Sequence, residues 1–222
     1  MKYPTALASL LVIFGLTVLA TSPAKAELFG DLYLGSSVTE DADVSRSDPG
    51  STITQQEDFG SSFTLGLRVG YRLEGKPWLG FSVDYSDYAV TVLNRDIFVS
   101  PLSGLVMLRI CGLKSADFPN GRLNPYFALG PGIFYSVEKE SYAPPPFGPL
   151  VTAGNQDASI NLGLDLRLGL SWGIRENLAV FGEYRHTRVE PEFGGHSFGE
   201  NVQVETELRT NHWVAGISFH FH

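Results

Sequence analysis

The stretch Ile160–Ile174, INLGLDLRLGLSWGI, alternates without interruption between large apolar residues and small or polar ones. A period of two is the period of a β-strand, in which successive side chains point to opposite faces. Every even position holds Ile, Leu or Trp, and every odd position holds Asn, Gly, Asp, Arg or Ser. Such a strand needs an apolar environment on one face and a polar environment on the other, and the fold must supply both.

The same alternation returns in seven other segments, and no stretch after residue 26 has a convincing helical pattern. We therefore expect eight strands, the other seven near residues 28–38, 61–73, 78–88, 104–113, 126–137, 177–187 and 212–221. Pro131 lies inside one of them. Because proline has no N–H to donate, we expect Pro131 at a bulge or a locally unpaired position.

The connections between these strands differ in length and composition. Those at 74–77, 114–122 and 174–177 are short or moderate, whereas those at 39–60, 140–157 and 190–206 are long and polar, with 94–100 as a shorter member of the second set. Eight strands that run up and down place all long loops at one end and all short turns at the other. The lone Cys111 excludes an internal disulfide and is expected to be a small apolar filler.

The N-terminus has the pattern of a secretory signal peptide. Lys2 gives a positive start, the run Ala6–Ala20 is apolar, and Ala24-Lys25-Ala26 supplies a small-x-small cleavage site. We expect residues 1–26 to be a signal peptide cut before Glu27, and residues 27–222 to be the mature domain. Its loss makes the net charge of −8 two units more negative, which argues against binding to nucleic acid.

The polar face of the predicted strands carries five arginines and four acids among many glycines, and almost no lysine lies in mid-strand. Arginine paired with carboxylates suits a narrow interior better than a solvated surface. The leucine-rich face, with aromatic residues near the strand ends, suits hydrocarbon bounded by aromatic girdles. A membrane permits no open sheet edge, so the sheet must close on itself. The expected lumen ion-pair network comprises Asp31, Arg68, Arg72, Asp84, Arg109, Asp165, Arg167, Glu183 and Arg185.

Three segments carry a resemblance to a known family: NPYFALGPGIFYS (Asn124–Ser136), LGLSWGIRENLAVFGEYRHT (Leu168–Thr187) and the ending VAGISFHF. Together with the pattern of the whole chain, they resemble the eight-stranded, OmpA/OmpX-like outer-membrane proteins of Gram-negative bacteria. The resemblance implies an all-β fold, namely an eight-stranded antiparallel up-and-down transmembrane β-barrel in the bacterial outer membrane. It also implies that Gly216, Phe219 and Phe221 form a C-terminal signal for the barrel-assembly machinery.

The family includes anchors, adhesins, enzymes and ligand carriers, so its motifs specify architecture rather than activity. We expect a structural or surface-interaction role through the long outer loops, with the lumen plugged by ion pairs. The expected partners are outer-membrane lipid, lipopolysaccharide, the barrel-assembly machinery and a possible extracellular ligand at the loops. The acidic segment 39–60 stays solvated or binds divalent cations that bridge lipopolysaccharide. No cofactor is expected.

Two alternatives stay open. An enzyme acting on lipid A or phospholipid would need a histidine near a serine, and the chain offers His186 with Glu183, and His196 with Ser197. The family's deacylases imply a compact His-x-Ser-Asn pattern, which Thr187 and Arg188 do not match, so we expect no catalytic residues. The other alternative is a narrow channel or carrier for small apolar solutes. The histidines at 212, 220 and 222 are interpreted as interior or rim residues, and no metal site is expected.

Overall fold

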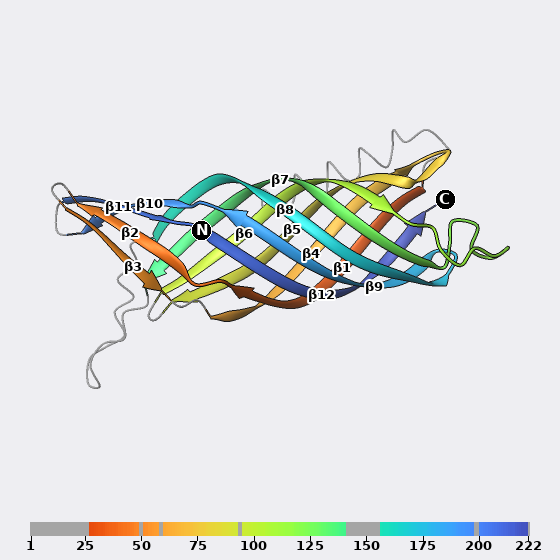
Figure 1. Ribbon diagram of the computed structural model, residues 1–222, viewed down its shortest axis with the longest axis horizontal. Coiled ribbons are helices and arrows are strands. Elements are labelled where there is room, and N and C mark those ends of the chain that lie inside the picture. Colours follow the sequence, from red (N-terminus) through yellow and green to blue (C-terminus); the bar gives the residue numbers. More distant parts are fainter. Residues whose placement is uncertain are drawn as a thin grey trace.

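The computed structural model describes residues 27–48, 51–57, 60–92, 95–140, 156–197 and 200–221, and these contain strands and connections but no helix. The strands are β1 (Glu27–Thr39), β2 (Ala42–Asp48), β3 (Ser51–Glu57), β4 (Ser61–Leu73), β5 (Lys76–Val92), β6 (Arg95–Arg109), β7 (Leu123–Glu140), β8 (Gln156–Arg175), β9 (Leu178–Val189), β10 (Glu192–Ser197), β11 (Glu200–Thr206) and β12 (Leu208–Phe221). Figure 1 shows the long strands tilted around a common axis.

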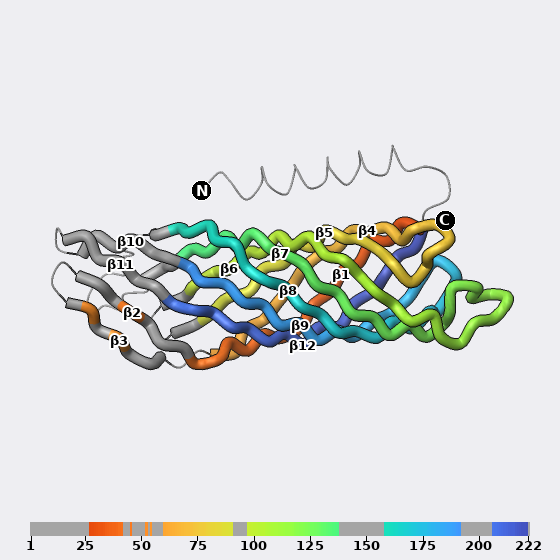
Figure 2. The backbone as a smooth tube through the Cα atoms, turned by 45° about the horizontal axis from the view of Figure 1, so that its top comes forward, coloured from red at the N-terminus to blue at the C-terminus, as the bar shows by residue number. Residues whose placement is uncertain are grey.

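Eight of the strands close into a barrel in the order β1-β12-β9-β8-β7-β6-β5-β4, and every neighbouring pair is antiparallel. This confirms the predicted fold class. The turns at 74–75 and 176–177 lie at one end, together with the connection 110–122 and the paired residues Leu28 and Phe221 (Figure 2). We call this the turn end and the opposite one the loop end. Gly75 has a φ of 72°, the left-handed conformation that such a two-residue turn requires.

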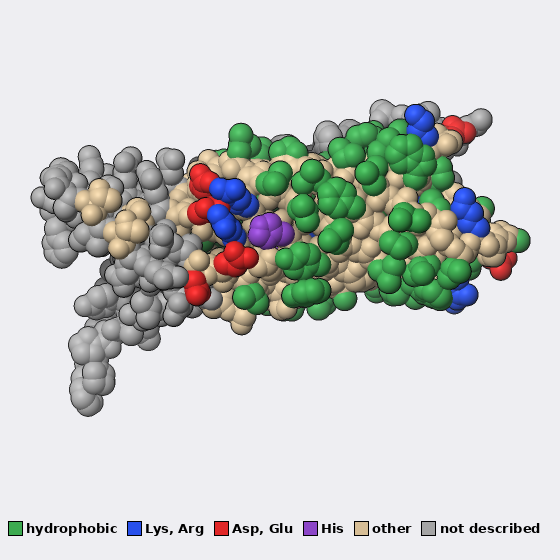
Figure 3. All heavy atoms as spheres, viewed as in Figure 1, with side chains coloured by type: hydrophobic (Ala, Val, Ile, Leu, Met, Phe, Trp, Pro, Cys, Tyr) green, Lys and Arg blue, Asp and Glu red, His purple; other side chains and the backbone are tan. Residues whose placement is uncertain are grey.

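The two faces of the barrel wall have the polarity that the sequence predicts. On β8, Leu162 is 78% exposed and points outward, whereas Asp165 and Arg167 are each 1% exposed and point inward. The same alternation holds along β4, β9 and β12, and Figure 3 shows hydrophobic side chains spread over the face of the barrel that is in view. The apolar face therefore surrounds the barrel, and the polar face fills it.

Proline interrupts the wall on both sides of β6. Between β6 and β7 the ladder passes from Ser103↔Gly132 to Val106↔Leu129 without pairs at Pro131 and Gly130, as expected for a residue that has no N–H. Between β5 and β6 a similar gap lies at Pro101. The predicted unpaired position of Pro131 is thus confirmed on its β6 side, while its β8 side pairs with Leu164.

The prediction that 39–60 and 190–206 are loops is wrong for most of their length. These segments form β2, β3, β10 and β11, a four-stranded antiparallel sheet in the order β10-β11-β2-β3. β1 pairs with β12 in the barrel, so the segments that follow β1 and precede β12 leave side by side and can pair. This sheet extends beyond the loop end in Figure 1. Residues 95–100, expected in a loop, belong to β6. The predicted signal peptide and most of 140–157 lie outside the described residues.

Candidate functional site

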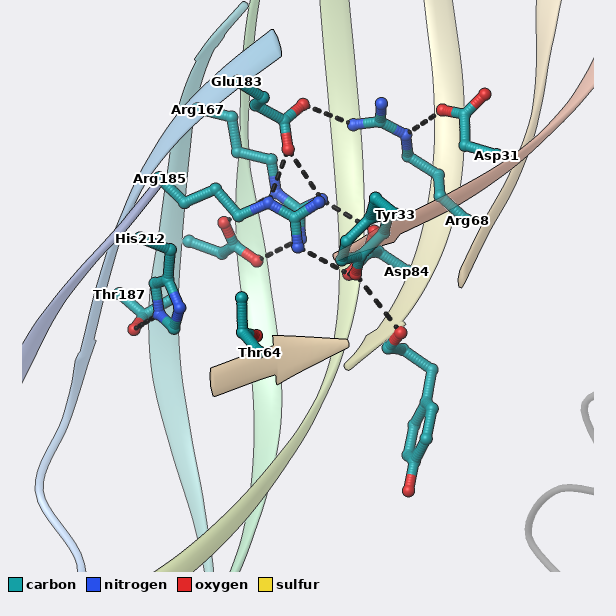
Figure 4. A network of polar contacts seen from close by, with 12 residues as sticks. Asp31, Tyr33, Thr64, Arg68, Asp84, Arg167, Glu183, Arg185, Thr187 and His212 are labelled. Atoms are coloured by element: carbon teal, nitrogen blue, oxygen red, sulfur yellow. Dashed lines mark hydrogen bonds and ion pairs between the residues drawn. The ribbon is translucent and has the colours of Figure 1, made fainter. Parts of the chain in front are cut away.

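Seven of the nine charged residues expected in the lumen form one connected group at mid-barrel, which we call the central ion belt: Asp31, Arg68, Asp84, Asp165, Arg167, Glu183 and Arg185. They come from β1, β4 and β5 on one side of the lumen and from β8 and β9 on the other (Figure 4). All seven side chains are buried. Because these strands are tilted and staggered, residues far apart in sequence reach the same level.

Arg68 joins the two sides of the lumen. Its Nε donates to Asp31 Oδ2 at 2.6 Å, and its Nη1 donates to Glu183 Oε2 at 2.7 Å. Asp31 stands opposite Arg68 in the β1–β4 ladder, so that contact is local, whereas the bond to Glu183 crosses from β4 to β9. The Tyr126 hydroxyl also donates to Glu183, at 2.7 Å. The guanidinium lies 5.2 Å from the Phe181 ring centroid, a cation–π distance.

Arg167 makes the second crossing. Its Nε and Nη2 bind the two oxygens of Asp165 at 2.9 and 2.6 Å, a bidentate pair, while its Nη1 donates to Asp84 Oδ2 at 2.7 Å across the lumen. The Tyr33 hydroxyl donates to Asp84 Oδ1, also at 2.7 Å. Asp84 and Asp165 therefore each accept more than one hydrogen bond, which offsets the cost of burying their charges.

Arg185 completes the belt. Its Nε donates to Glu183 Oε1 at 2.5 Å, its Nη1 lies 3.5 Å from Asp84 Oδ1, and the guanidinium stacks 3.8 Å from the Tyr33 ring centroid. The belt holds three arginines and four carboxylates, so by itself it carries one negative charge.

The other two predicted lumen residues lie nearer the turn end, in a separate group that we call the basal group. Here Glu27 accepts a bond from Arg72, and its Oε2 lies 3.1 Å from Arg109 Nη2. His220 Nδ1 is 2.7 Å from Glu27 Oε1. With two arginines and one carboxylate, the basal group carries the opposite charge to the belt when His220 is neutral, so the two groups together have no net charge.

Sequence reasoning missed several residues of both groups. The prediction includes Glu27 only as the start of the mature chain, although its place two and four residues before Phe29 and Asp31 puts it on the inward face. The alternation predicts Tyr33 and Tyr126 as strand residues but not as hydrogen-bond donors to the belt. Their alternation placed Tyr33 inward, but nothing in one strand identifies an acceptor on another.

Above the belt, toward the loop end, the lumen changes character. His212 packs edge-on against Tyr88 with ring centroids 4.7 Å apart, and its Nε2 is 3.2 Å from Thr187 Oγ1. Beyond them lies a buried apolar cluster that also includes Tyr88: Val90, Ile97, Val99, Phe134, Val189 and Leu208. Among the described residues, no group of three potential metal ligands occurs. Side chains therefore fill the lumen at three levels, basal, central and upper.

The residues of the expected C-terminal signal lie on β12. Phe219 and Phe221 are exposed on the lipid-facing side. Gly216 has a packing role: a Cβ there would lie 2.6 Å from the Phe181 ring and 2.7 Å from Tyr33 Cβ. The missing side chain makes room for these two aromatic residues, which flank Gly216 on the neighbouring strands β9 and β1.

His186, the candidate catalytic histidine, and Glu183, its candidate acid, point to opposite faces of β9. His186 lies on the outer side of β9, where its Nδ1 is 2.9 Å from Asn211 Oδ1, whereas Glu183 points into the lumen. No serine is a hydrogen-bond partner of His186 among the described residues. The side chains of His196 and Ser197 lie outside what the structure describes.

Comparison with solved structures identifies the same fold in distant proteins. OprG of Pseudomonas aeruginosa aligns with a TM-score of 0.60 at 15% identity, covering 90% of this chain and 97% of that chain. The outer membrane protein AlkL aligns with a TM-score of 0.57 at 11% identity, covering 90% and 93%. Neisserial surface protein A aligns with a TM-score of 0.52 at 16% identity, covering 88% and 97%. No curated protein matches the chain.

The family of this chain is shown by its match to a protein-family model. The family described as outer membrane protein beta-barrel domain matches residues 10–221, nearly the whole chain. The match agrees with the closed eight-stranded barrel, its outward apolar belt and its ion-filled lumen. The chain belongs to this family and is a β-barrel protein of the bacterial outer membrane.

Proposed function

We propose that this protein is a closed barrel with a structural or surface-interaction role, and that its lumen does not conduct solutes. In bacterial barrels the short turns are periplasmic and the longer connections extracellular. The loop end with its four-stranded sheet therefore faces the outside of the cell. The observation that carries the proposal is the pair of ion bridges across the lumen, Arg68–Glu183 and Arg167–Asp84. An interior of eight strands is only wide enough for side chains, and here they are held together by charge.

The spaces near the turn end fit this proposal. A cavity of about 290 Å³ opens beside Glu27, Phe118 and His220. Between the basal group and the central ion belt, the cavity lined by Asp31 and Tyr126 measures only about 20 Å³. That is room for about one water molecule. Solute entering from the periplasm would meet the belt at this point.

Conductance in planar bilayers tests the proposal. The wild-type protein should give no sustained current above that of the bare membrane. A variant in which Arg68 and Arg167 are both replaced by serine removes both bridges and should conduct if it folds. Sustained conductance by the wild type would contradict the proposal without any need for the variant.

One observation favours a second candidate, a carrier for small apolar solutes. The buried cluster near the loop end is apolar, and two of its members, Tyr88 and Val99, lie next to the ladder gap at Pro101. A locally unpaired wall beside an apolar interior is where such a solute would leave sideways. Uptake of an alkane by liposomes that contain the protein distinguishes the candidates, because a plugged structural barrel should give only the background rate.

We propose that the protein is not an enzyme. The support is the separation of His186 and Glu183 onto opposite faces of β9. Incubation with lipid A and with phospholipid, followed by mass spectrometry of the lipids, should show no loss or transfer of acyl chains.

Processing and assembly are part of the same proposal. Residues 1–26 are removed as a signal peptide, so N-terminal sequencing of the protein from outer membranes should begin at Glu27. The exposed Phe221 belongs to the signal for the assembly machinery, so replacing Phe221 with alanine should lower the amount of folded barrel in the membrane. Normal assembly of that variant would contradict this role.

A further inference from the structure

The outer wall carries a second group of charges, near the loop end of β9 and β12. Its members are His186 and Arg188 of β9, Glu190, Glu207, and Arg209 and Asn211 of β12, and we call it the rim patch. In Figure 3, acidic and basic side chains and a histidine gather at the loop-end border of the hydrophobic belt. The mechanism proposed for the lumen does not involve any of these residues.

The outward residues of β9 and β12 change in a regular order along the barrel. Starting from the turn end, the paired positions are Val180 with Ile217, then Gly182 with Ala215, Tyr184 with Trp213, His186 with Asn211, and finally Arg188 with Arg209. This is the order of hydrocarbon, interfacial aromatic belt and polar headgroups across one leaflet. The two arginines therefore lie at the depth of the headgroups of the outer leaflet.

Arg188 and Arg209 stand directly opposite each other in the ladder. Like charges in such a pair repel, so the arrangement calls for an anion between them. Glu207 partly meets this need: its Oε1 lies 2.5 Å from Arg188 Nε and 2.7 Å from Arg209 Nε. These hydrogen bonds hold the pKa of the Glu207 carboxyl below its ordinary value, Arg209 contributing most.

Both guanidinium groups have capacity for another ligand. The Arg188 and Arg209 side chains are 50% and 48% exposed, and within the described part of the chain neither Nη1 has an acceptor. Exposed ion pairs are weak because water screens them, so a phosphate that binds two guanidinium groups can compete with Glu190 or Glu207.

The neighbouring side chains suit a sugar. Glu190 and Glu40 offer carboxylate oxygens to hydroxyl groups, and Glu40 is held in place by Asn211 Nδ2 at 3.0 Å. Trp213 is 64% exposed directly below, packed against Tyr184 with ring centroids 4.8 Å apart. An aromatic face beside hydrogen-bonding groups is a common platform for an amphipathic ring.

We propose that the rim patch binds the phosphorylated sugar headgroup of a glycolipid in the outer leaflet, with Arg188 and Arg209 on the phosphate and the acyl chains along the adjacent apolar wall. The occupant is a lipid rather than free phosphate because the patch adjoins the exposed belt below Trp213. The site is separate from the lumen, so it stands whether or not the barrel conducts.

Native mass spectrometry of the protein in detergent tests this, with bisphosphorylated lipid A as the probe. Replacing Arg188 and Arg209 by glutamine should weaken binding at least about tenfold, the loss expected for a charge-assisted contact. Arg175→Gln, at an exposed position near the turn end, is the matched control and should bind as the wild type does. Dephosphorylated lipid A should bind wild type and double variant equally weakly.

Three results would overturn the proposal. They are unchanged binding of lipid A by the double variant, equal binding of phosphorylated and dephosphorylated lipid by the wild type, and displacement of the lipid by an equal concentration of inorganic phosphate. The last result would assign the patch to free phosphate. Folding is checked by the shift in gel mobility on boiling, and the two single variants decide the matter if the double variant does not fold.

Discussion

The central ion belt and the rim patch are built from the same chemistry in opposite surroundings. Each contains arginines bridged by a shared carboxylate, Glu183 in the lumen and Glu207 on the outer wall. In the belt every side chain is buried, so removing one charge leaves its partner without solvent to replace it. In the rim patch the side chains are partly exposed, and water or a ligand can replace a lost partner. Burial, rather than the number of ion pairs, therefore decides whether a network holds a structure together or remains free to bind.

The largest effect is expected from breaking the belt. Arg167→Met leaves Asp165 without its bidentate partner and Asp84 without one of its donors, and it should lower the free energy of unfolding by about 3–5 kcal/mol. Equilibrium urea unfolding in detergent micelles measures this. Removing Asp165 as well, as Asp165→Leu with Arg167→Met, should recover part of the loss because the uncompensated charge is gone. A double variant less stable than Arg167→Met would contradict this account.

A smaller loss of stability is expected when a tyrosine hydroxyl is removed, and the loss should be larger in the lumen than on the outer wall. Tyr33→Phe takes away the donor to Asp84 in the lumen and should cost about 1.5–3 kcal/mol, as for a buried hydrogen bond to a charged group. Tyr184→Phe is the matched control, because its hydroxyl donates to Asn211 at 2.6 Å on the outer wall. If the two variants lose equal stability by urea unfolding, the contrast between inside and outside does not hold.

Breaking the rim patch should change stability still less. Arg188→Gln removes two exposed ion pairs, to Glu190 and Glu207, and should alter the free energy of unfolding by less than about 1 kcal/mol. The same urea titration measures it beside Arg167→Met. A loss as large as that of the belt variant would show that the patch is structural rather than available to a ligand.

The smallest effect concerns pH. Arg209 and Arg188 lower the pKa of Glu207 in the folded protein, so its contribution to stability is present above the unfolded pKa and is lost as pH falls through the folded one. Carbon-13 NMR of the glutamate carboxyls should show Glu207 titrating below ordinary glutamates. The titration midpoint should move up in Arg209→Gln, and an unchanged midpoint would exclude Arg209 as the main cause.

Alternation in single strands was enough to predict most of the barrel. INLGLDLRLGLSWGI already separates Leu164 from Asp165, and the same rule places Arg68, Glu183 and Arg185 inside. The four-stranded sheet at the loop end was not predicted, because its strands do not show this alternation. Its strands, such as STITQQE and ENVQVET, are polar and lack a regular apolar face, so their composition is that of loops. They pair because the barrel brings their ends together.

The apolar face of each strand, the number of barrel strands and most of the charges in the lumen follow from the order of the amino acids alone, because all three depend on a local period of two. Which of these charges meet is set by the folded barrel. Arg68 pairs with Glu183 across the lumen. Arg72 and Arg109 pair with Glu27 in a separate group near the turn end, and Arg188 faces Arg209 on the outer wall. These partners depend on the stagger between strands and on closure of the sheet, which are properties of the whole barrel and of no single strand.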